Sequence, residues 1–177
     1  KTKGIPVRKD VFTMKQNALK VTMSAVIAAL TAVTTAYIFH IPMTLFGGQG
    51  YVHIGDAIIF LGASLLPTGY ACAAAALGGA LADLLSGAAL WAPWTLVIKA
   101  LIALCFTAKG ATILNKRNYM ALFGAVAITV AGYYVAEGFL YGNWITPVYS
   151  ITGNLIQWVA SSILYVVLGL ALDKLRL

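Results

Sequence analysis

The sequence predicts an all-α integral membrane protein with six transmembrane helices. Of its 177 residues, 61% are hydrophobic and only 10% are charged, whereas a soluble domain carries about 25% charged residues. The mean hydropathy is +0.89. The apolar residues are gathered in separate stretches, most of them close to the length of about 20 residues that a membrane-spanning helix needs. We therefore expect a single membrane domain over residues 1–177, without a second domain.

The positions of the basic residues predict the orientation. Six of the twelve lie within the first 20 residues: Lys1, Lys3, Arg8, Lys9, Lys15 and Lys20. Three more lie in one later segment, Lys109, Lys116 and Arg117, and two lie near the C-terminus, Lys174 and Arg176. Six spans put all these segments on one side, and Lys and Arg accumulate in cytoplasmic segments. The net charge of +7 thus marks a cytoplasmic face, with both termini inside, rather than a nucleic-acid patch.

The first half of the chain contains two unequal spans. Residues 1–17 form a basic cytoplasmic arm, and the first span covers residues 18–39. A long outer loop follows, because Pro42 and the run Gly47-Gly48-Gln49-Gly50 do not favour a span. The second span, residues 54–66, would be only about 20 Å long at 1.5 Å per residue. We therefore expect an irregular or unwound start at Gly55-Asp56.

Four further spans are separated by turns or polar loops. The turn Pro67-Thr68-Gly69 precedes the third span, and residues 86–90, 109–118 and 142–147 form the later connections. The predicted spans are 70–85, 91–108, 119–141 and 148–172.

The first span carries small residues at helical spacing: Ala25, Ala28, Ala29 and Ala32. Small residues three or four apart allow another helix to approach closely. The other helix can belong to a partner protein or to this chain, and the spacing alone does not decide between them.

Charged and amide side chains gather in the outer half of the predicted bundle. Asp83 and Lys99 lie within apolar stretches, where each charge costs roughly 2.5–3.5 kcal/mol when centrally placed. They can form a structural ion pair or contact a ligand. Glu137 has no evident partner in its own helix, and Asn154 and Gln157 share one face of the sixth span. The inner half is expected to be nearly pure Ala, Leu, Ile and Val.

Other functional classes are disfavoured. Several Trp and Tyr residues lie at the outer depth, where an interfacial aromatic belt is the alternative to a binding role. The chain has no P-loop, zinc-protease or nucleophile-elbow motif, so we expect no enzyme. Two histidines and two cysteines within apolar stretches do not predict a metal site. No cofactor is expected.

Three segments resemble a known family. These are His53-Ile-Gly-Asp56, the run from Ala80 to Gly87 and the run from Trp91 to Lys99. Together with the alanine spacing of the first span, they resemble the substrate-binding S components of energy-coupling factor (ECF) vitamin transporters. The resemblance implies a multi-pass protein of the prokaryotic plasma membrane that captures a vitamin from outside. It also implies docking on a transmembrane coupling protein that carries two ATPase subunits.

Within that family the chain looks most like members assigned to pyridoxine or to hydroxymethylpyrimidine. The candidate substrate-binding residues are His53, Asp56, Asp83, Trp91, Trp94, Lys99, Tyr134, Glu137, Tyr141, Asn154 and Gln157. The candidate partner-binding residues are Ala25, Ala28, Ala29 and Ala32. Three alternatives stay open: an S component for pantothenate or another vitamin, a self-sufficient proton-coupled transporter that uses Glu137 or Asp83, and a scaffold without a transport substrate.

Overall fold

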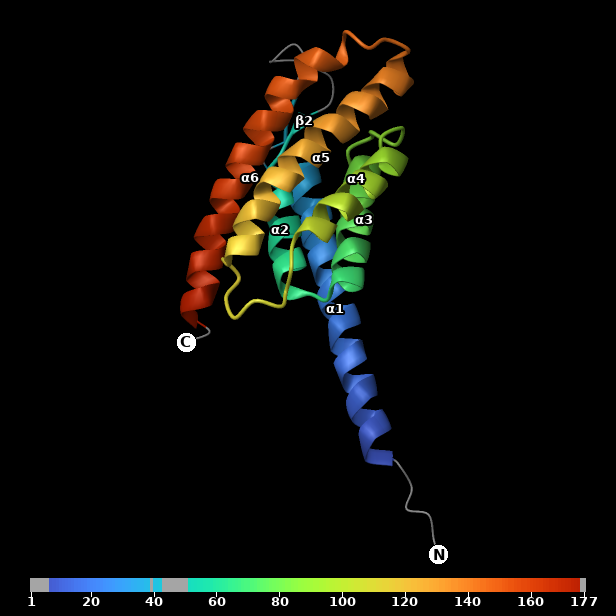
Figure 1. Cartoon of the computed structure of the whole chain (residues 1–177). Coiled ribbons are helices and arrows are strands. Elements are labelled where there is room, and N and C mark those ends of the chain that lie inside the picture. Colours follow the sequence, from blue (N-terminus) through green and yellow to red (C-terminus); the bar gives the residue numbers. More distant parts are fainter. Residues whose placement is uncertain (1–6, 39, 43–50, 176–177) are drawn as a thin grey trace, which may run out of the picture.

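The computed structural model describes residues 7–38, 40–42 and 51–175 of the chain (Figure 1). These residues form six helices and one pair of short strands. The helices are α1 (Val7–Tyr37), α2 (Asp56–Leu65), α3 (Thr68–Leu85), α4 (Ala92–Cys105), α5 (Lys116–Tyr141) and α6 (Pro147–Leu175). The strands are β1 (Ile41–Pro42) and β2 (Tyr51–Val52).

Four of the six helices are long and apolar enough to cross a membrane: α1 from Phe12 onward, α3, α5 and α6. The other two, α2 with 10 residues and α4 with 14, reach only about 15 and 21 Å. The hydrocarbon core is about 30 Å thick, so neither helix is long enough to cross it alone. The non-helical residues before α2 are covered by protein, since Val52, His53 and Gly55 are buried, as irregular backbone at membrane depth would require.

The helix α1 begins earlier than the predicted span. It starts at Val7 and therefore includes most of the predicted basic arm. The segment after Pro6 contains no Pro or Gly before Tyr37, and Lys, Gln and Met are good helix formers. In Figure 1 the N-terminal part of α1 extends beyond the body formed by the other helices.

The outer loop contains a feature that the sequence does not predict. Strands β1 and β2 pair antiparallel, with Ile41 opposite Val52 and Pro42 opposite Tyr51. The pairing fixes the position of Tyr51 over the bundle. The glycine-rich run 47–50 lies outside the described residues.

The alanines of α1 divide between two environments. Ala28 and Ala32 are 7% and 3% exposed, because α1 packs along α3. A methyl group in place of the Gly78 hydrogen would lie 2.8 Å from the Ala28 carbonyl oxygen, so the close approach depends on glycine. Ala25 and Ala29 are exposed. Ala28 and Ala32 therefore pack within this chain, and only Ala25 and Ala29 present a surface to a partner.

The inner half of the bundle is not purely apolar, contrary to the sequence-based expectation. Asn118 is fully buried, and its side-chain NH₂ donates to Ser64 Oγ at 3.1 Å and to the Thr107 carbonyl oxygen at 2.9 Å. Asp173 accepts hydrogen bonds from the backbone N–H groups of Ile113 and Leu114 at 2.7 and 3.0 Å. These bonds attach the α4–α5 connection to α2 and α6, where an apolar contact could not satisfy its backbone groups.

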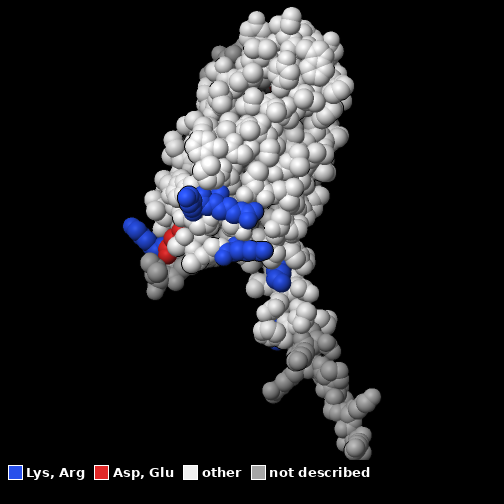
Figure 2. All heavy atoms as spheres, in the orientation of Figure 1, with Lys and Arg blue, Asp and Glu red and all other residues white. Residues whose placement is uncertain are grey.

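Apart from the buried Lys99, the described Lys and Arg residues lie toward one end of the body. Figure 1 places the C-terminal end of α6, the α4–α5 connection and the protruding part of α1 at the lower end, and the α5–α6 connection at the upper end. On the face that Figure 2 shows, the Lys and Arg side chains gather at this lower end. The positive-inside rule then predicts that the lower end faces the cytoplasm.

We expect a cysteine at Lys109 to react with a membrane-impermeant maleimide only from the cytoplasmic side. A cysteine at Asn143 should react only from the outside. Both positions are exposed, and they lie at opposite ends of the body (Figure 1). The background variant carries Cys72→Ser and Cys105→Ser and serves as the unlabelled control. Labelling of both positions from the same side would contradict this topology.

Candidate functional site

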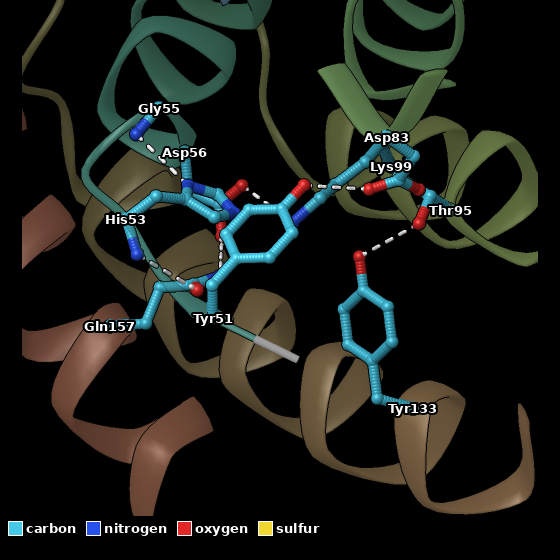
Figure 3. Close-up of polar contacts among 9 residues, drawn as sticks. All are labelled: Tyr51, His53, Gly55, Asp56, Asp83, Thr95, Lys99, Tyr133 and Gln157. Atoms are coloured by element: carbon cyan, nitrogen blue, oxygen red, sulfur yellow. Dashed lines mark hydrogen bonds and ion pairs between the residues drawn. The ribbon is translucent and has the colours of Figure 1, made fainter. Parts of the chain in front are cut away.

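A buried ion pair lies at the centre of the site. Lys99 Nζ of α4 lies 2.6 Å from Asp56 Oδ1 of α2, and both side chains are 2% exposed (Figure 3). Gln157 of α6 donates from Nε2 to the other carboxylate oxygen, Asp56 Oδ2, at 2.8 Å. The Lys99 ammonium also lies 5.4 Å from the centre of the Tyr133 ring, within the range of a cation–π interaction.

The ionic partner of Lys99 differs from the one considered in the sequence. The Asp83–Lys99 ion pair, one of the two alternatives considered, does not form, because Lys99 pairs with Asp56. Helix α2 begins only at Asp56, which brings that carboxylate to the depth of Lys99. Gly79 makes room for the lysine stem, since a methyl group there would lie 2.8 Å from Lys99 Cγ.

Asp83 instead binds the outer hairpin. Tyr51 of β2 donates its hydroxyl to Asp83 Oδ1 at 2.8 Å, and its ring stacks on His40 with the ring centres 3.9 Å apart. Burial and the nearby Asp83 charge raise the pKa of Tyr51, so the phenol stays protonated and remains a donor. The hairpin is thereby attached to α3 next to the cavity.

His53 organises the start of α2 as a neutral side chain. Its Nδ1 accepts a hydrogen bond from the Gly55 backbone N–H at 3.1 Å, which places the ring proton on Nε2.

Glu137 has a partner on the neighbouring helix. The side chain is 2% exposed, and its Oε2 accepts a hydrogen bond from Ser150 Oγ of α6 at 2.7 Å. One hydrogen bond from a hydroxyl group leaves acceptor capacity on the carboxyl group. Glu137 can therefore serve a ligand as well as the α5–α6 contact.

Residues of all six helices and of β2 line one cavity, which opens to solvent. Of the predicted site residues, those that line the cavity are His53, Asp83, Trp91, Lys99, Glu137, Asn154 and Gln157. Asp56 lies behind this wall, where it holds Lys99 and Gln157.

Besides Asp56, three predicted residues do not line the cavity. Trp94 stacks on Phe139, with ring centres 5.8 Å apart, and Tyr141 packs against Trp91 at 6.2 Å. Tyr134 donates its hydroxyl to the Trp144 carbonyl oxygen at 2.8 Å. These contacts belong to the outer aromatic cluster, as the interfacial-belt alternative expects.

Sequence reasoning missed five polar residues that line the cavity: Thr31, Thr35, Tyr51, Thr95 and Tyr133. Tyr133 belongs to the outer set of aromatic residues, and Thr31 and Thr35 share a helix face through their spacing of four. Threonine is too common in apolar helices for that spacing to be specific. No group of three His, Cys, Asp or Glu that could hold a metal ion occurs in the part of the chain that the structure describes.

A family model described as "ECF-type riboflavin transporter, S component" matches residues 15–174. The match covers most of the chain. The chain belongs to this family. A comparison with curated proteins returned no match.

As an ECF S component, the chain is a membrane-embedded transporter subunit that associates with components of an ECF module and with a vitamin substrate. Several helices able to cross a membrane agree with this assignment. The family description names riboflavin, so it supports the transporter class but not the choice of pyridoxine or hydroxymethylpyrimidine.

The ion pair gives a stability prediction for this S component. Lys99→Met leaves the Asp56 carboxylate buried without its cation, and breaking such a pair is destabilising by about 3–5 kcal/mol. The double variant Lys99→Met/Asp56→Asn removes both charges and should recover much of that loss. Thermal unfolding in detergent measures both effects. Lys109→Met, at an exposed site, is the control. A Lys99→Met variant as stable as the wild type would contradict the Lys99–Asp56 ion pair.

Proposed function

We propose that this chain is the high-affinity substrate-binding subunit of an ECF-type transporter, with six membrane spans and both termini in the cytoplasm. It captures a small water-soluble vitamin or precursor from the outside, through the end of the bundle that carries β2. The basic residues at the opposite end (Figure 2) support this orientation. The observation that carries the proposal is a cavity lined by every helix, with charged and amide side chains among its lining residues, in a chain of this family.

The charges around the cavity favour an uncharged or weakly basic ligand. Lys99 is paired with Asp56, so its charge is already compensated. Asp83 and Glu137 also line the cavity and carry the remaining formal negative charge. A carboxylate ligand such as pantothenate would add a further negative charge to a low-dielectric space. A heterocycle that donates N–H or O–H groups to these acids is favoured instead.

Pyridoxine and hydroxymethylpyrimidine have this chemistry. Each combines one aromatic ring with polar substituents, and Trp91 and Tyr133 line the cavity as stacking partners. Riboflavin, which the family description names, is the second candidate, since it too is an uncharged heterocycle. Its three fused rings need a longer site than a single ring does. The single-ring vitamins are therefore the first choice.

The energy for transport comes from partners in this proposal. The coupling protein, which carries two ATPase subunits, docks on the exposed small residues of α1, Ala25 and Ala29, because small side chains permit close helix contact. Uptake should then require the ATPase partners. Uptake by the reconstituted chain alone in a proton gradient would instead indicate a secondary transporter.

We expect isothermal titration to show tight binding of pyridoxine or hydroxymethylpyrimidine and none of pantothenate. Asp83→Asn and Glu137→Gln should each weaken binding by at least about 1.5 kcal/mol, since each removes a charged acceptor. This is a loss of about tenfold. Asp173→Asn makes the same change at the inner end, where Asp173 binds the α4–α5 connection, and should leave affinity unchanged.

Two results would contradict the proposal. Tight binding of pantothenate would show that the charge argument is wrong. Tight binding of riboflavin with no response to the single-ring vitamins would keep the family function and overturn the choice by size.

A further inference from the structure

Three buried polar atoms on the cavity have no hydrogen-bond partner among the described residues. They are Thr31 Oγ1 and Thr35 Oγ1 of α1 and Asp83 Oδ2 of α3. The three residues are only 1%, 4% and 5% exposed. Buried polar groups in proteins are almost always hydrogen-bonded. Three unpaired atoms on one cavity therefore indicate a ligand that supplies the missing partners.

The two threonines differ from Ser24 and Ser64 in their hydrogen bonding. A Ser or Thr inside a helix commonly bonds the carbonyl oxygen one turn earlier, as Ser24 and Ser64 do at 2.8 Å. Thr31 and Thr35 form no such bond. Instead they pack against glycines of the neighbouring segments: a methyl group at Gly78 would lie 2.9 Å from Thr31 Cβ, and one at Gly55 would clash with Thr35 Oγ1.

The second carboxylate oxygen of Asp83, Oδ2, has no hydrogen bond of good geometry within the described chain. The other oxygen accepts from Tyr51. The Thr95 hydroxyl lies beside the Asp83 carboxyl group (Figure 3) and interacts with it, and it is also within hydrogen-bond distance of the Tyr133 hydroxyl, at 3.3 Å. Lys99 binds Asp56. A carboxylate oxygen accepts more than one hydrogen bond, so an O–H or N–H group of a ligand can bind Asp83 Oδ2.

We propose that Thr31, Thr35 and Asp83 form a subsite for a hydroxyl-bearing substituent of the vitamin, a hydroxymethyl group in the favoured ligands. A hydroxyl group offers one donor and two acceptor positions. It can donate to Asp83 Oδ2 and accept from both threonine hydroxyls, which matches the three unpaired atoms in number and in type. The inference rests on the proposed function and adds that α1 itself takes part in substrate recognition.

The test uses Thr31→Val and Thr35→Val, which keep the side-chain shape and remove the hydroxyl. Titration with pyridoxine and hydroxymethylpyrimidine should show at least about fivefold weaker binding in each variant, as expected for one lost hydrogen bond. The melting temperature without ligand should stay the same or rise, because no bond within the protein is lost. An analogue with a methyl group in place of the hydroxymethyl group should bind the wild type weakly. Its affinity should fall little further in the two valine variants.

Two control variants separate this effect from general changes. Thr34→Val makes the same change at a buried position of α1 that does not line the cavity. Ser161→Ala removes another buried hydroxyl without a partner in the described chain, on α6 and away from the cavity lining. Both should leave affinity within about twofold of the wild type, well below the effect of a lost hydrogen bond.

The outcomes distinguish the subsite from the proposed function. If the wild type binds none of the vitamins, the proposed function fails and the subsite with it. If the wild type binds and both valine variants bind equally well, only the subsite is overturned. Valine variants that melt at lower temperature with unchanged affinity would show that the hydroxyl groups serve the fold.

Discussion

Lys99 brings a positive charge into a helix that is otherwise apolar, and the fold has to compensate that charge far from water. Asp56 does so at 2.6 Å, with Gln157 bound to the second carboxylate oxygen. The pair ties α4 to α2 and α6. It requires α2 to begin within the bundle and α3 to have a glycine, Gly79, against the lysine stem. The buried, non-helical residues before Asp56, held by the neutral His53 ring, follow from the same requirement.

Because this pair is internally compensated, the cavity beside it is available for recognition. Asp83 and Glu137 face the cavity, each with a hydroxyl group as hydrogen-bond donor, and the two α1 threonines lie opposite α3. The inner half of the bundle has a different task. Its polar groups, Asn118 and Asp173, bind the α4–α5 connection rather than a ligand. In the proposed function, ligand recognition and structural support are therefore separated along the bundle.

Composition and apolar patterning were sufficient to predict an all-helical chain with six helices, while the outer position of the polar cluster stays a prediction. The ionic partner of Lys99 could not be predicted in the same way. A helix-by-helix view treats Asp83 and Lys99 as neighbours, whereas the true partner depends on where non-helical backbone places Asp56. The same limit explains Trp94, Tyr134 and Tyr141, whose directions are set by packing against Phe139, Trp144 and Trp91. The burial of Ala28 and Ala32 likewise depends on a contact with α3 that spacing alone cannot assign.

The central claim is that an internally compensated lysine leaves a cavity suited to an uncharged or weakly basic ring compound. Mass spectrometry of the small molecule that co-purifies with the wild-type protein tests this claim directly, since the molecule is chosen by the protein rather than by the experimenter. We predict a single-ring heterocycle that carries a hydroxymethyl group. A carboxylate such as pantothenate in the cavity would contradict the account.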